Sequence, residues 1–131
     1  MSNRRRPALV NIYRSEFLRS RAWFARRDRW FRDQTARGIP LECAACGQPA
    51  DKHHLELHHL DYTGMSSTNG RWLALEAHED LMPLHPYCHD LLHRLIDRDP
   101  VLSGNRTRRD ATHVALQRLR PKLQPADGST P

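Results

Sequence analysis

The chain has 131 residues, of which 38% are hydrophobic, and it carries 21 Lys and Arg against 15 Asp and Glu. This length and composition predict one domain with a small core, which a bound metal would help to stabilise. The longest apolar runs span three or four residues, which excludes a membrane-spanning helix. The N-terminal residues also lack the apolar stretch of a signal peptide, so we predict a cytoplasmic protein with no membrane partner.

Charge is distributed unevenly along the sequence. Residues 1–37 contain 11 Arg and three acidic residues, residues 38–99 contain four basic and ten acidic residues, and residues 100–131 contain six basic and two acidic residues. Two basic flanks around an acidic centre indicate contact with a polyanion, for which we expect nucleic acid. The alternative is a solvated basic helix without a partner. Besides positions 4–6, the arginines expected to contact backbone phosphates are Arg26, Arg27, Arg29, Arg106, Arg108 and Arg109.

The N-terminal part is predicted to form two helices separated by a bend. Ser20 is a suitable N-cap for a helix over residues 21–37, and Gly38 and Pro40 are stop signals after it. Apolar side chains recur every seven residues here, so we expect them to form one buried helical face. They are Val10, Phe17, Phe24 and Phe31.

Two short strands are predicted in the centre of the chain. The alternation of Leu55 and Leu57 indicates a strand over residues 55–60, which ends near a pair of histidines. Residues 61–79 are rich in Gly and small polar residues and are expected to form a loop that can include one helical turn over residues 72–77. The second predicted strand covers residues 81–84, where Pro83 allows only an edge position or a bulge.

Two further helices are predicted toward the C-terminus. Apolar residues with helical spacing follow Pro86, so a helix is expected from there to just before Pro100. A last helix is expected over residues 105–120. Its inward side chains should be Ala111, Val114, Ala115 and Leu119. Residues 125–131 are rich in Pro, Gly, Ser and Thr and are expected to be disordered.

Four residues in two pairs have the pattern of a structural zinc site. Cys43-x2-Cys46 and His85-x2-Cys88 each place two ligands with two residues between them. Three thiolates and one imidazole can close a tetrahedron around zinc and leave no position open for a substrate. The alternative for the cysteines is that they are ordinary buried thiols.

A second cluster consists of histidines alone. His89 and His93 are four residues apart on a predicted helix, so both project from one face, where a third ligand from a strand can complete an open metal site. Adjacent strand residues point to opposite faces. One of His58 and His59 can therefore bind metal while the other transfers a proton, a combination suited to phosphodiester hydrolysis. The alternatives are that His89 caps or packs and that His93 is an exposed helix residue.

Together these motifs resemble those of a known family. In chain order they are Cys43-x2-Cys46, His58-His59-x2-Tyr62, Asp80 and Cys88-His89-x3-His93, after a helical segment over residues 13–23. Over residues 13–93 the sequence resembles the HNH endonuclease family, whose fold is called ββα-metal, and in particular small bacterial and phage members with a paired-Cys zinc site.

The resemblance implies roles for single residues. The implied ligands of the catalytic metal are His58, His89 and His93. His59 is the implied general base, and Asp80 stands where the family has an Asn that holds the motif in place. Tyr62 fits either a catalytic or a packing role. The chain departs from the family at His85, where a Cys is usual, and in the longer interval between Tyr62 and Asp80.

The resemblance also implies a fold and its divisions. We expect an α+β, mostly helical protein in which a ββα-metal core with a zinc site is flanked by N-terminal and C-terminal helices. The expected parts are a basic, aromatic-rich helical segment (residues 1–40), the nuclease core with its zinc site (41–99), a basic C-terminal helix (100–124) and a disordered tail (125–131).

The implied activity is hydrolysis of DNA phosphodiester bonds, by nicking or by double-strand cleavage, at one divalent metal for which Mg, Mn, Ni and Zn are candidates. Double-stranded DNA would be bound mainly through its backbone. A second copy of the chain and a phage packaging protein stay open as further partners. The alternatives are a non-catalytic zinc-binding module of the same fold that binds nucleic acid or a partner protein, and an RNA-cleaving toxin or a packaging nuclease.

Overall fold

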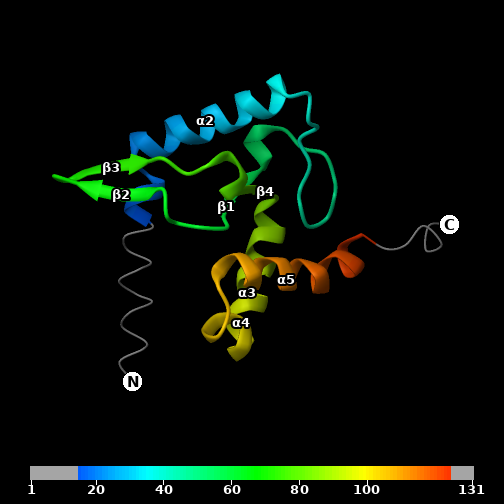
Figure 1. The fold of residues 1–131 in the computed structure, drawn as a ribbon. Helices are drawn as coiled ribbons and strands as arrows, with labels where there is room; N and C mark the ends of the chain where they lie inside the picture. Colours follow the sequence, from blue (N-terminus) through cyan, green and yellow to red (C-terminus); the bar gives the residue numbers. More distant parts are fainter. Residues whose placement is uncertain (1–14, 125–131) are drawn as a thin grey trace.

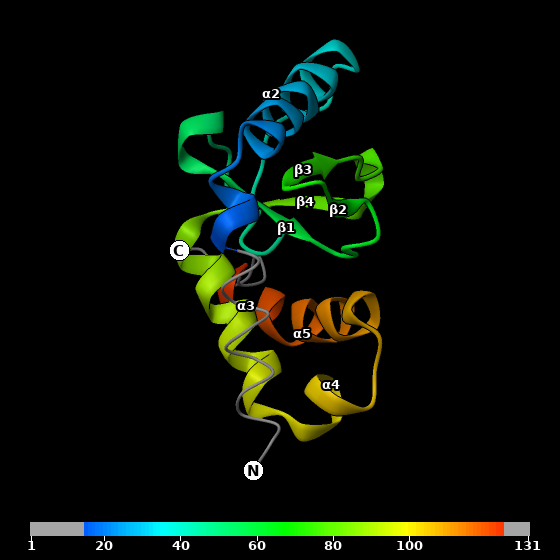
Figure 2. The ribbon, with the colours of Figure 1, turned by 90° about the vertical axis from the view of Figure 1, so that its left-hand side faces the viewer.

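The computed structural model describes residues 15–124, and the expectations for residues 1–14 and 125–131 lie outside this range. The fold is α+β. Helix α2 (Arg21–Ala36) lies on one side of two small antiparallel sheets, and helices α3 (Pro86–Arg98), α4 (Pro100–Gly104) and α5 (Arg108–Leu123) lie on the other (Figures 1 and 2). No helix among the described residues has the length and apolar character to cross a membrane.

The N-terminal helices are separated at Ser20, as predicted. Residues 15–18 are helical, and the Ser20 hydroxyl then accepts a hydrogen bond from the Trp23 backbone N–H at 3.2 Å and caps α2. The expected seven-residue apolar face is wrong for Phe24, whose side chain is 53% exposed. Phe17 and Phe31 are buried as expected, and Trp23 and Trp30 form a further buried pair seven residues apart on α2.

The central sheet consists of the two predicted strands. β1 (Glu56–His59) pairs antiparallel with β4 (Leu81–Leu84), with Leu57 opposite Pro83. Each strand of a two-stranded sheet is an edge, so Pro83 is tolerated as expected. The Pro83 carbonyl accepts a hydrogen bond from the Ala44 backbone N–H at 2.9 Å, which ties the preceding cysteine loop to the sheet.

The segment between these strands differs from the prediction. A hairpin of β2 (Met65–Thr68) and β3 (Arg71–Ala74) replaces the expected loop with its helical turn. Asn69 and Gly70 connect the strands with φ values of 51° and 75°. Asn-Gly is the pair that a tight hairpin turn favours, because both residues tolerate positive φ. β3 packs against α2 and brings the residues that follow it toward the core.

The C-terminal half is helical, as predicted. α3 ends before Pro100, and the Asp99 carboxylate then caps α4, a short helix that was not predicted. α5 begins at Arg108, continues past Pro121 and packs across α3 (Figure 2). Ala111 and Ala115 of α5 are buried, whereas the other two side chains expected to point inward are partly buried.

Candidate active site

The four residues of the predicted zinc site come together. Cys43, Cys46, His85 and Cys88, which we call the cysteine cluster, each offer a ligand atom within 4.8 Å of all the others. Cys46 Sγ lies 3.2 Å from His85 Nδ1. Three sulfur atoms and one imidazole nitrogen fit a tetrahedral ion such as zinc, and the cluster is therefore a candidate metal site.

Local backbone structure positions the cysteine cluster. The turn after Cys43 closes through a hydrogen bond of 2.9 Å from the Gly47 N–H to the Cys43 carbonyl, with Gly47 at a φ of 77°. His85 is the N-cap of α3, and Cys88 lies in the first turn of that helix. The end of α5 supports the turn from outside, because the Gln124 amide donates to the Ala45 carbonyl at 2.6 Å.

Two thiols of this cluster differ in acidity. Burial raises the pKa of Cys88 to about 12, and the nearby Cys43 adds to the effect. Burial also opposes ionisation of Cys43, but backbone N–H groups of Cys46 and His85 outweigh it and hold the pKa of Cys43 below its usual value. Cys43 is therefore more easily ionised than Cys88, whose thiol must release a proton to become a ligand.

Three imidazoles meet beneath the central sheet. His58 of β1 and His89 and His93 of α3 form this histidine cluster. His89 Nε2 lies 3.2 Å from His58 Nδ1 and 3.0 Å from His93 Nε2. Nitrogens about 2 Å from one ion lie about 3 Å from one another, so this spacing fits three ligands of a single metal.

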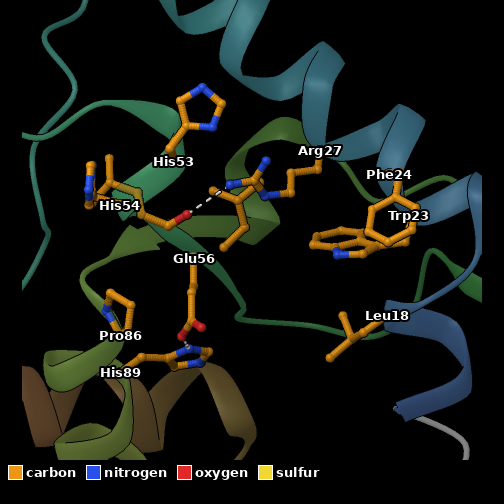
Figure 3. A pocket seen from close by; sticks show the side chains of 11 residues that line it. Leu18, Trp23, Phe24, Arg27, His53, His54, Glu56, Pro86 and His89 are labelled. Carbon is orange, nitrogen blue, oxygen red and sulfur yellow. Dashed lines mark hydrogen bonds and ion pairs between the residues drawn. The ribbon is translucent and has the colours of Figure 1, made fainter.

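Neighbouring groups orient two of these rings. The Nδ1 atom of His89 lies 2.8 Å from a carboxylate oxygen of Glu56 (Figure 3). A carboxylate accepts hydrogen bonds, so His89 carries its proton on Nδ1 and presents the Nε2 lone pair to the cluster. His58 Nε2 lies 3.0 Å from the hydroxyl of Thr112 on α5. Burial, with a contribution from Arg108, strongly lowers the pKa of His58 and keeps it in the neutral form that binds metals.

His59 points away from the histidine cluster, as the alternation of a strand predicts. Its Nε2 atom lies 2.6 Å from Oε2 of Glu76, and the two side chains are 3% and 0% exposed. The His59 ring stacks on Tyr62 with ring centroids 4.8 Å apart and packs against Trp23 at the same distance. By accepting a hydrogen bond from Nε2–H, Glu76 fixes the tautomer and leaves the lone pair on Nδ1.

One cavity is lined both by His59 and by members of the histidine cluster. It has a volume of about 240 Å³, and its lining includes His59, His89 and His93. Tyr62 and Arg108 also line it, and the Arg108 guanidinium lies 4.5 Å above the Tyr62 ring. The residue expected to act as base and two of the three expected metal ligands therefore line the same space, which we call the catalytic cavity.

Asp80 does not line this cavity and instead contacts neighbouring elements of the fold. Its carboxylate forms an ion pair with Arg109 of α5, and its backbone carbonyl accepts a hydrogen bond from the Leu60 N–H at 2.8 Å. Asp80 thereby ties the end of β1 to the start of β4 and to α5.

The predicted phosphate-binding arginines have different environments. Contrary to the expectation, Arg26 does not lie on the surface: it is buried, and its Nε atom donates to the Glu76 carbonyl at 2.9 Å. Helix periodicity places it on the core face between Trp23 and Trp30. Arg27 donates to the Leu55 carbonyl at 3.0 Å. Of the remaining four, Arg29 and Arg106 are exposed, whereas Arg108 and Arg109 are half-buried.

Glu56, Glu76 and Thr112 were not predicted as site residues. Glu56 lies two positions before His58 and therefore on the same face of β1, which is a signal that the sequence contains. Glu76 and Thr112 reach their histidines only through the tertiary fold, across 17 and 54 positions of the chain.

A comparison of the chain with protein-family models, with curated proteins and with solved structures finds no match.

Proposed function

We propose that this protein is a metal-dependent endonuclease of the HNH type that hydrolyses phosphodiester bonds of DNA. His59 is the general base, and His58, His89 and His93 hold one divalent metal ion. The observation that carries the proposal is the catalytic cavity, in which His59 and two of the metal-binding imidazoles face one space. General base and metal must act on the same phosphate, so this shared space is a requirement of the reaction.

The arrangement of the elements supports the same proposal. The pair β1–β4 is antiparallel and is followed at once by α3. His58 and His59 stand at the end of β1, while His89 and His93 stand on successive turns of α3. This is the order of strand, strand and helix expected of a ββα-metal core.

His59 moves the proton in the proposed reaction. The Nδ1 lone pair accepts a proton from water, and the imidazolium that results keeps its Nε2 proton and donates a hydrogen bond through it to the Glu76 carboxylate. The carboxylate stabilises this cation at a buried position, where an uncompensated charge is costly. Glu76 is therefore a positioning residue for the base.

The histidine cluster suits the proposed metal by its chemistry. Three imidazole ligands favour transition metals such as Zn, Ni or Mn over Mg. When bound, the ion supplies a Lewis acid that stabilises negative charge on the phosphate and on the leaving oxygen. Glu56 orients His89, and Arg108 adds a positive charge at the cavity wall.

The cysteine cluster is proposed to hold a structural zinc ion. Its four ligands complete a tetrahedron and leave no open position for substrate. None of the three cysteines is in a disulfide, so each sulfur can become a thiolate ligand. A reducing compartment preserves that state, and we accordingly propose a cytoplasmic location.

One observation favours the alternative of a non-catalytic zinc-binding module that binds nucleic acid or a partner protein. The His59 side chain is almost fully buried and packs tightly between two aromatic rings. A histidine in such surroundings can serve packing alone. The two functions differ in whether the chain turns over a substrate.

The test is cleavage of supercoiled plasmid by chelator-treated protein that is resupplied separately with Mg, Mn, Ni or Zn. We expect nicking or linearisation with at least one transition metal, and its loss in His59→Ala. His113→Ala, an exposed histidine of α5 outside both clusters, is the matched control and should cleave normally. Plasmid that is retarded on the gel but never cut would favour the binding module.

A further inference from the structure

A second cavity adjoins the catalytic cavity. It has a volume of about 420 Å³, in the range of small-molecule sites, and lies between the N-terminal helices and the start of α3 (Figure 3). Leu18, Leu57 and His89 line both cavities. A group that entered the second cavity would therefore lie beside His89, one of the three proposed metal ligands.

One wall of the second cavity is aromatic and open. Phe24 stands next to Trp23 on this wall, but unlike that buried ring it is 53% exposed. Leu18 beside it is also exposed, and Pro86 closes the opposite side (Figure 3). An accessible flat ring beside apolar neighbours is the surface on which nucleobases stack.

The remaining lining carries hydrogen-bonding groups. His53 and His54 are exposed on a short 3-10 helix at the rim (Lys52–His54). At the opposite edge lies Glu56, which uses Oε1 to orient His89. Its carboxylate also faces this cavity, where it can accept a hydrogen bond from the amino group of a base. One residue thus links the second cavity to the metal site.

We propose that the second cavity holds the base of the nucleotide next to the scissile phosphate, and that the substrate is therefore single-stranded or locally unpaired DNA. The inference rests on the proposed nuclease function. A base that is paired and stacked in a duplex cannot lie against Phe24, because it must first leave the stack. Single strands offer such bases without that cost.

Two measurements test the proposal. The first compares binding, by fluorescence, of a single-stranded oligonucleotide that contains 2-aminopurine with binding of its duplex, on metal-loaded protein in the His59→Ala background. We expect the single strand to bind about tenfold more tightly, and Phe24→Ala to remove about tenfold of that affinity. Val101→Ala, which truncates an exposed apolar residue of α4 outside both cavities, should bind like the parent.

The second measurement compares cleavage of the same two oligonucleotides by protein with an intact His59. Faster cleavage of the single strand, slowed by Phe24→Ala and not by Val101→Ala, supports the base-binding cavity. Equal cleavage of both substrates, unaffected by Phe24→Ala, overturns it and leaves the nuclease in place. If neither substrate is cut with any metal, the nuclease function fails, and the fluorescence result alone decides the cavity. A cavity made for a peptide would show no preference between the oligonucleotides.

Discussion

His59 and Glu76 form a buried pair in which Nε2 and Oε2 lie 2.6 Å apart. The two residues come from different elements, since His59 ends β1 and Glu76 follows β3. The β2–β3 hairpin, which was not predicted from the sequence, places the Glu76 carboxylate beside His59. Glu76 Oε1 has no hydrogen-bond partner among the described residues, so the carboxylate is held mainly by His59 and by its backbone.

The charge of Glu76 is expected to matter more for turnover than for folding. In Glu76→Gln the amide oxygen can still accept the Nε2 proton of His59, but the negative charge that stabilises the imidazolium is lost. We expect kcat to fall by at least about tenfold, within the ~10²–10⁴ that general-base catalysis contributes. Glu79→Gln, a nearby exposed carboxylate, is the control. A Glu76→Gln enzyme with full activity would remove the carboxylate from the mechanism.

Gly64 is expected to be required for the position of Glu76. A Cβ atom at Gly64 would lie 2.4 Å from the Glu76 backbone nitrogen, so Gly64→Ala must displace that segment. We expect a loss of about 1–3 kcal/mol in the free energy of unfolding, as in other overpacked sites, together with reduced cleavage. Gly104→Ala provides the comparison, because nothing lies within 4 Å of its added Cβ. Denaturant unfolding of both variants measures the difference.

The sequence predicted those parts of the site that depend on local spacing. Cys43 and Cys46 lie in one turn, and His89 and His93 lie on one helix face, so their spacing alone identifies them. Strand alternation separated His58 from His59 for the same reason. Glu76 depends on the hairpin, and the signal that could have revealed the hairpin, Asn69-Gly70, lay in a segment that composition suggested was a loop.

Burial was the property that the sequence predicted least well. Charge alone suggested that Arg26 lies on the surface, whereas helix periodicity places it between Trp23 and Trp30. Phe24, one position after the buried Trp23, was expected in the core but is exposed.

The cysteine cluster should stabilise the fold and bind zinc more weakly as the pH falls. The raised pKa of Cys88 means that its thiol is protonated without metal, so zinc binding must release that proton. Protons therefore compete with zinc, and the affinity should fall by about tenfold per pH unit for each proton released. Competition with a chromophoric chelator at several pH values measures this slope.

A substitution in the cysteine cluster should have a different effect from a substitution of His59, the proposed general base. Cys88→Ser is expected to lower both the zinc content and the melting temperature, because a structural zinc contributes folding free energy. His59→Ala should keep the zinc of the cysteine cluster. Equal destabilisation by the two substitutions, with unchanged metal content in both, would contradict the division into a structural and a catalytic site.

Arg26 and Arg29 are three residues apart on α2 and are expected to respond in opposite ways. Arg26→Ala removes a buried hydrogen bond to the Glu76 carbonyl and should destabilise the fold by about 1–3 kcal/mol. Arg29 is exposed, so Arg29→Ala should leave the melting temperature unchanged.

If Arg29 contacts a phosphate, its loss lowers the slope of log K against log salt concentration by about one. Binding of a DNA oligonucleotide across a salt series, with Arg26→Ala measured well below its melting temperature, separates the two roles. An unchanged salt slope in Arg29→Ala would mean that the DNA lies on another face of the molecule.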